Sequence, residues 1–261
     1  MSTATATRPH GFHARGAGTR PSLARLTKVE LRKMTDTRAG FWLLLSLVGL
    51  TALVVVISAL TGPALDHRFQ PMLYNALQPG TVLLPIIGIL LVTSEWSQRT
   101  AMITFALVPH RERVLAAKLL ASVVLATVAF VATLAMAAVA TAASASGVDG
   151  QWTLGAGLFG QMAFSTAISM LVGVGFGAAL LLSAPAIVGF FAIPIAVSAA
   201  THVVHALRGV GQWIDQARTL PDLLDHSYSA DEWAKAGVTL VVWLAVPLAI
   251  GAWRFTRGEV R

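Results

Sequence analysis

Residues 150–201 contain no Asp, Glu, Lys, Arg or His. As one α-helix this run would be about 78 Å long, more than twice the ~30 Å hydrocarbon core of a bilayer. Soluble domains carry roughly 25% charged residues, whereas this chain has 12% charged and 56% hydrophobic residues. We therefore predict an integral membrane protein whose charge-free run folds back on itself.

Apolar runs separated by Gly, Pro and charged residues predict an all-α integral membrane fold with six transmembrane helices. The expected spans are residues 40–60, 71–94, 115–143, 157–183, 185–206 and 232–253. Pro79 and Pro85 predict a kinked second span. Ser183, Ala184 and Pro185 indicate the turn between the fourth and fifth spans.

Shorter signals predict how the spans begin and pack. Ser229 and Glu232 stand in the spacing of a capping box at the start of the last span. Gly173 and Gly177 are four residues apart, a spacing that permits close helix approach, which we expect within the chain rather than between copies. Apolar residues at helical spacing within 207–224 predict a short external helix in the outer interface.

Domain organisation follows from the same patterns. Residues 1–21 consist mostly of Ser, Thr, Ala, Gly, Pro and Arg, and we expect them to form a disordered cytoplasmic tail. Residues 22–261 are expected to form a single six-span domain. No cysteine is present, so thiolate metal sites and disulfides are excluded.

The basic residues predict the orientation of the chain. With the N-terminus inside, fifteen of the nineteen Lys and Arg residues fall in segments on that side. The positive-inside rule therefore places both termini in the cytoplasm. The net charge of +7 is carried beside apolar segments, so the expected partner is the membrane lipid surface and no nucleic acid is expected.

Residues 22–38 predict a basic amphipathic helix in the inner interface, leading into the first span. Glu30 falls within its apolar face. Either this carboxylate faces protein and a basic partner, or the helix is rolled so that Glu30 reaches the headgroups, and the sequence leaves both open. The candidate functional residues of this helix and its end are Glu30, Arg32, Lys33 and Arg38.

A second segment, residues 100–108, predicts a short helix between the second and third spans that presents apolar residues to the cytoplasm. Pro109 ends it. Such a helix is either a docking element for a soluble partner or a connector packed on its own bundle. The sequence does not separate these two interpretations.

The order of residues around this segment resembles the permease family of type 2 ABC exporters. The residues that carry the resemblance are Glu95, Trp96, Thr100, Pro109, Arg111 and Lys118. The Glu-Leu-Arg-Lys sequence at 30–33 is similar to the family's amphipathic helix before the first span. The small-residue-rich stretch 173–187 is similar to its turn between spans four and five. The resemblance covers residues 22–261.

The resemblance implies a permease subunit of the bacterial cytoplasmic membrane that pairs with a second copy, expected as a homodimer, and with two copies of a separate ABC ATPase subunit. ATP and Mg would be bound by that ATPase, because this chain has no Gly-x-x-x-x-Gly-Lys-Ser/Thr phosphate loop and no cofactor of its own is expected. The chain itself is expected not to be an enzyme. The implied ATPase-coupling residues are Glu95, Thr100, Met102, Ile103, Phe105, Leu107, Pro109 and Arg111.

The expected function is export of an apolar or amphipathic substrate, such as a drug, an antibiotic or a lipid-like molecule, by alternating access. No buried charge is evident in the wall of the path, whereas ion pathways carry intramembrane ionisable groups. Two alternatives stay open. One is a non-transporting membrane anchor or immunity protein that recruits a cytoplasmic partner. The other is an intramembrane metalloenzyme or hydrolase that uses His202, His205 and an external Asp.

The orientation is testable because the native chain has no cysteine to remove. Single cysteines at residues 66, 149 and 222 should react with a membrane-impermeant thiol reagent added outside intact cells. Cysteines at residues 99 and 257 should react only after the cells are opened. Labelling of residue 99 from outside would contradict this orientation.

Overall fold

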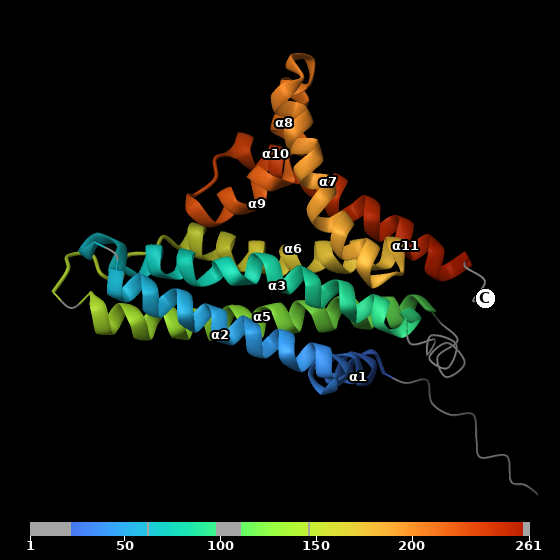
Figure 1. Ribbon diagram of the computed structural model, residues 1–261, viewed down its shortest axis with the longest axis horizontal. Coiled ribbons are helices and arrows are strands. Elements are labelled where there is room, and N and C mark those ends of the chain that lie inside the picture. The colour runs from blue at the N-terminus through green and yellow to red at the C-terminus, as the bar shows by residue number, and fades with distance from the viewer. Residues whose placement is uncertain (1–21, 62, 98–110, 146, 258–261) are drawn as a thin grey trace, which may run out of the picture.

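The computed structural model describes residues 22–61, 63–97, 111–145 and 147–257. Within these residues all regular structure is helical, with no strand (Figure 1). Six helical segments are long and apolar enough to cross a membrane, which confirms an all-α, multi-pass membrane protein. They are Arg38–Thr61, Phe69–Ser97, Glu112–Ser144, Ala156–Leu180, Ser183–Val203 and Ala230–Arg254.

Four long helices form an elongated bundle, and other helices pack against several of them. The bundle contains α2 (Arg38–Thr61), α3 (Phe69–Ser97), α5 (Arg111–Ser144) and α6 (Ala156–Leu180) (Figure 1). Outside it, α7 (Ser183–Val203) and α11 (Val246–Arg257) pack against α6. The amphipathic helix predicted before the first span is α1 (Leu23–Asp36), which has Ser22 as its N-cap.

The turn between the fourth and fifth spans differs from the prediction. Leu181 adopts a left-handed conformation with φ of 59°, so α6 ends at Leu180 rather than at residue 183. The next helix begins at Ser183 rather than at 185. Pro185 therefore lies in the first turn of α7, where a missing amide removes no intrahelical hydrogen bond. A proline expected to break the helix instead helps to start it.

The segment between the fifth and sixth spans, predicted to be external, also differs in detail. The fifth span ends at Val203 rather than at 206, since Val204 has extended backbone angles. Beyond it, residues 207–224 form two helices rather than one, α8 (Arg208–Ile214) and α9 (Gln216–Asp225). Asp215 separates them, and its carboxylate caps α9 by accepting a hydrogen bond from the Ala217 amide.

The last span begins as predicted and then contains a local irregularity. At the start of α10 (Ala230–Leu240), both hydrogen bonds of the Ser229–Glu232 capping box are present, which confirms that prediction. A π-helical segment, Val241–Ala245, continues α10 into α11. The helices α8 and α10 lie together at the end of α7 away from the bundle, whereas α9 packs on α6 (Figure 1).

The most extensive helix contact joins α3 and α6. A Cβ atom on Gly173 would clash with the carbonyl oxygen of Pro85, and one on Gly177 would lie 2.9 Å from that of Ile89. On the other helix, a Cβ atom on Gly88 would clash with the Met170 carbonyl oxygen. The spacing of Gly173 and Gly177 therefore serves packing within the chain, as predicted. The helix α3 continues through its interior prolines, Pro79 and Pro85.

This packing predicts that Gly173→Ala forces α3 and α6 apart. Overpacking of this kind costs about 1–3 kcal/mol, so we expect a lower melting temperature in detergent. Gly160→Ala is the matched control, because Gly160 lies in the same helix with open space around its Cβ position. Since Ala favours helix over Gly, the control should be neutral or slightly stabilising. Equal loss of stability in both variants would contradict close packing at Gly173.

Candidate functional site

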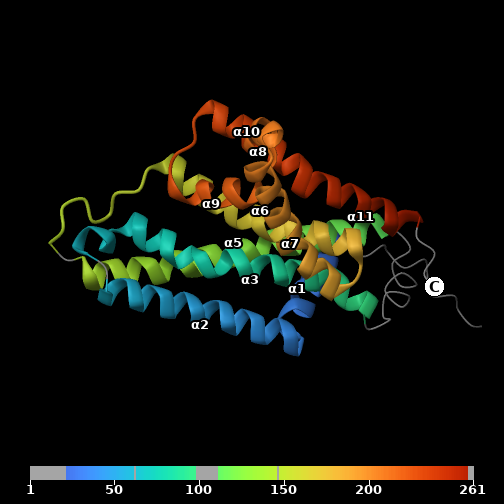
Figure 2. The same cartoon turned by 45° about the horizontal axis from the view of Figure 1, so that its top comes forward.

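Four charged side chains from three helices meet at one end of the bundle. Glu30 and Lys33 come from α1, Glu95 from α3 and Lys118 from α5. We call these residues the buried charge cluster. The views in Figures 1 and 2 place α1 at the end of the bundle where α3 ends and where α5 and α7 begin.

Lys118 is the centre of the cluster, and its side chain has no exposed surface. Its Nζ lies 2.6 Å from Glu30 Oε2, 3.2 Å from Glu95 Oε1 and 3.0 Å from the Leu91 carbonyl oxygen. An ammonium group has three hydrogens to donate, so its three neighbours match its donors. Lys118 is therefore buried as a charged group with a full set of acceptors.

Lys33 completes the cluster on the outer side of the two carboxylates. Its Nζ lies 2.8 Å from Glu30 Oε1 and 2.6 Å from Glu95 Oε1. Burial lowers the pKa of Lys33, but its hydrogen bonds to Glu30 and Glu95 outweigh this effect, so the pKa lies above its ordinary value. Two cations thus alternate with two anions, and the cluster has no net charge.

The amphipathic pattern of α1 explains how a carboxylate reaches this position. Glu30 and Met34, one turn apart, are the buried residues of α1. Of the two possibilities left open by the sequence, the structure has the one in which Glu30 faces protein and basic partners. The alternative, in which Glu30 reaches the headgroups, is excluded by its 5% side-chain exposure.

The structure places some of the predicted site residues and leaves others untested. Lys118, Glu30 and Glu95 are buried at the end of the bundle. Arg32 and Arg38 are exposed, on α1 and at the start of α2. Arg111 is the first residue of α5. The other predicted coupling residues lie outside the described residues, in 98–110: Thr100, Met102, Ile103, Phe105, Leu107 and Pro109.

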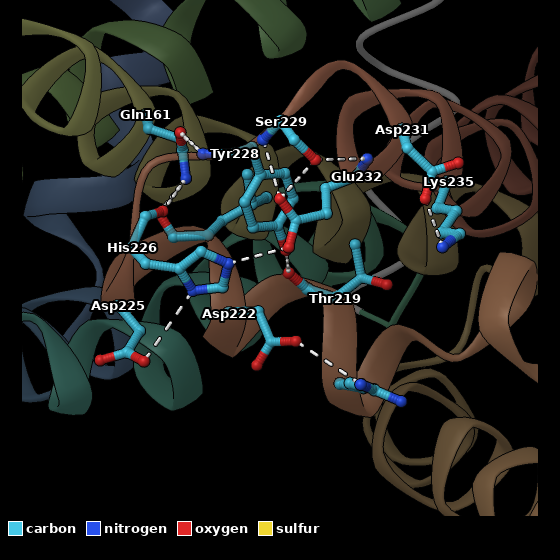
Figure 3. A network of polar contacts seen from close by, with 12 residues as sticks. Gln161, Thr219, Asp222, Asp225, His226, Tyr228, Ser229, Asp231, Glu232 and Lys235 are labelled. Atoms are coloured by element: carbon cyan, nitrogen blue, oxygen red, sulfur yellow. Dashed lines mark hydrogen bonds and ion pairs between the residues drawn. The ribbon is translucent and has the colours of Figure 1, made fainter.

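A second polar group lies at the loop between α9 and α10 (Figure 3). Gln161 of α6 is buried, and its Nε2 donates to the carbonyl oxygens of Leu223 and His226, at 3.2 and 2.7 Å. Its Oε1 accepts from the Tyr228 amide at 3.1 Å. One side chain of the bundle thereby binds three backbone groups in and next to this loop. The sequence gives no signal for this role other than a glutamine inside an apolar run.

The outer part of this group is solvated. His226 Nε2 lies 3.0 Å from Glu232 Oε1, and this hydrogen bond raises the pKa of His226 above its ordinary value (Figure 3). Burial raises the pKa of the Tyr228 hydroxyl, which donates to the Thr219 carbonyl oxygen at 2.9 Å. Both ring and carboxylate are exposed, so this is a surface network that orders the loop.

The histidines that suggested a metal site are not brought together with further ligands. His202 Nδ1 lies 2.7 Å from the Ser198 carbonyl oxygen in the preceding turn, and His205 is exposed. In the part of the chain that the structure describes, no group of three or more His, Cys, Asp or Glu residues is placed to hold a metal ion.

A cavity of about 230 Å³ lies between α3, α6, α7 and α9. Aromatic and aliphatic residues form most of its wall, together with the hydroxyl groups of Thr81, Ser165 and Ser169. No charged residue lines it. Such a lining suits an apolar or amphipathic molecule. Sequence reasoning did not find this cavity, because its wall comes from four helices that only the tertiary fold brings together.

Comparison with known proteins adds no assignment to this geometry. No protein-family model matches the chain, and a search of the curated proteins finds no match. The membership in the type 2 ABC exporter permeases that the resemblance implies is therefore a proposal.

The cluster predicts a large cost for removing its central cation. Lys118→Met leaves Glu30 and Glu95 buried with Lys33 alone, and breaking a buried pair in this way costs about 3–5 kcal/mol. We expect a correspondingly lower free energy of unfolding in mixed detergent micelles. Lys235→Met is the control: it removes the pair with Asp231, whose side chain is 66% exposed, and such pairs contribute about 0–1 kcal/mol. Similar losses in the two variants would contradict the assigned role of Lys118.

Proposed function

We propose that the chain is the membrane-spanning permease subunit of an ATP-driven exporter of the type 2 ABC family. It lies in the bacterial cytoplasmic membrane with both termini in the cytoplasm. The proposal joins the six-span fold to the motif resemblance of residues 22–261. The single observation that carries it is the buried charge cluster, which ties α1 to α3 and α5.

The position of the cluster supports a role in transmitting force. The connector 98–110 leaves α3 after Ser97 and enters α5 at Arg111. Glu95 lies two residues before that exit, and Lys118 lies seven residues after that entrance. A soluble partner that binds the connector therefore acts on two helix ends that are ion-paired to each other and to α1. A push at this end moves the three helices together.

The energetics of buried ion pairs favour a mechanical role over a purely stabilising one. Replacing such a network by apolar side chains of similar volume is often neutral or stabilising by about 1–4 kcal/mol, because both charges lose their hydration on burial. Stability alone therefore does not explain an ion-pair network at the connector. The network is better explained if it specifies how the helices are arranged. We take that geometry to be a fixed angle between α1 and the spans.

In this mechanism two ATPase subunits bind ATP and Mg, close on each other and press on residues 95–113 of two permease copies. The amphipathic helix α1 lies in the inner interface, and α8 and α9 form the external element over the export path. The two bundles then alternate between inward-closed and outward-open states. The uncharged cavity between α3, α6, α7 and α9 supports an apolar or amphipathic substrate rather than an ion.

The proposal predicts direct contact between Phe105 and an ATPase. A photoreactive benzoyl-phenylalanine placed at residue 105 in cells of the native host should crosslink to a polypeptide that also labels with azido-ATP. Burial of one large apolar side chain is worth roughly 1.5–3 kcal/mol. Phe105→Asp should therefore weaken ATPase retention during purification by about one to two decades.

The control places the same photoreactive residue at Trp152, at the opposite end of the bundle, where no ATP-binding adduct should form. Crosslinks from residue 105 only to proteins that do not bind ATP would refute the permease proposal and favour the anchor or immunity function. If the ATPase is captured, reconstitution in liposomes separates the remaining alternatives, since a permease makes ATP hydrolysis respond to apolar substrates and an anchor does not.

A further inference from the structure

A second cavity, of about 510 Å³, opens beside the charge cluster. It lies between the end of α1, the start of α2, the last turns of α3 and the first residue of α7. The first span begins at Arg38. The cavity therefore lies at the level where this apolar span meets the basic, amphipathic helix α1. Neither the resemblance nor the proposed transport function assigns this cavity a ligand.

One side of the cavity is built to receive an anion. Lys33 and Arg38 line it, and no carboxylate does. The hydroxyl groups of Thr37 and Ser94 add donors around the same space. Those of Ser97 and Ser183 also line it, but they are already bonded within the chain, to the Thr93 carbonyl oxygen and to Thr93 Oγ1. Ser183 also opens α7, whose N-terminus has no side-chain cap, so the positive end of that helix dipole adds to the basic character.

Of the two basic residues that line the cavity, Arg38 is the one whose side chain can bind a ligand. Lys33 is already engaged by Glu30 and Glu95, whereas Arg38 forms no ion pair with any described residue. Its backbone is fixed by a tight corner between α1 and α2. There the Gly40 amide donates to Thr37 Oγ1 at 3.1 Å, and a Cβ atom on Gly40 would clash with the Met34 carbonyl oxygen.

The other side of the cavity is apolar and points along the spans. Leu43, Ile87 and Leu90 form it. Leu43 is five residues beyond Arg38, about 7–8 Å deeper at the helical rise of 1.5 Å per residue. A ligand that fills the cavity therefore needs an anionic head beside Arg38 and a hydrocarbon part beside these side chains.

We propose that this cavity binds one anionic phospholipid, with its phosphate on Arg38 and the surrounding hydroxyl groups and the start of its acyl chains on Leu43, Ile87 and Leu90. Arginine binds phosphate through two parallel hydrogen bonds, which favours it for this role. The lipid rests against Lys33 and Met34, so its occupancy is coupled to the position of α1. The proposal does not depend on export or on an ATPase.

The test measures lipid retention by native mass spectrometry of the purified chain in neutral detergent. Phosphatidylglycerol should be retained in preference to phosphatidylcholine with the same acyl chains. Arg38→Gln should weaken phosphatidylglycerol binding about tenfold or more, since hydrogen bonds to charged groups are worth ≈ 1.5–3 kcal/mol. Arg32→Gln is the matched control, because Arg32 is an exposed arginine on α1 that does not line the cavity.

Two further variants keep the outcome clear if Arg38→Gln is poorly folded. Arg38→Lys should retain part of the preference for the anionic lipid, because it keeps the charge but not the paired hydrogen bonds. Leu90→Trp should reduce retention by filling the apolar side without a change of charge. The proposal is overturned if Arg38→Gln retains phosphatidylglycerol as the native chain does, or if Arg32→Gln loses as much. It is also overturned if inorganic phosphate displaces the lipid, which would indicate a site for free anions.

Discussion

An ammonium group inside a helical bundle is tolerated only where acceptors and anions surround it, because the low-dielectric interior penalises an unpaired charge. Lys118 meets this requirement with two carboxylates and one backbone carbonyl. This requirement constrains more than the side chain of Lys118. Because the acceptors come from α1 and α3, α1 lies across the end of the bundle and the ends of α3 and α5 lie beside each other. A basic cavity lies on the neighbouring side.

The two ends of the molecule use polar groups in different ways. At the α1 end, charges are buried and join separate helices, so movement of one helix is passed to the others. At the end that carries α8, α9 and α10, Gln161 binds backbone groups of a single loop, and the charges outside it are solvated. Close packing of α3 on α6 links the two ends. This division fits the proposed function, in which force is applied from one side.

Much of this fold follows from local sequence. The charge-free run 150–201, the capping box at Ser229 and the glycines of α6 each predicted the element that is found, because each acts within a few residues. The ion pairs could not be predicted in the same way. Glu30 and Lys118 were each singled out, but they are 88 residues apart, and pairing at that separation depends on tertiary packing. The turn was predicted at residues 183–185 but lies at Leu181, for a related reason. No sequence signal marks a leucine that adopts the left-handed conformation. Pro185 does give a signal, but a proline is compatible with the start of a helix as well as with a break.

The account depends most directly on the coupling between Glu30 and Lys118. A double-mutant cycle with Glu30→Gln, Lys118→Met and the combined variant, followed by free energies of unfolding in mixed detergent micelles, measures it. Groups in one ion-pair network show interaction energies of about 0.5–3 kcal/mol, and we expect the upper part of that range because both side chains are buried. If the single effects add to within about 0.3–0.5 kcal/mol, the two groups act independently. That result would contradict the claim that their ion pair couples α1 to the spans.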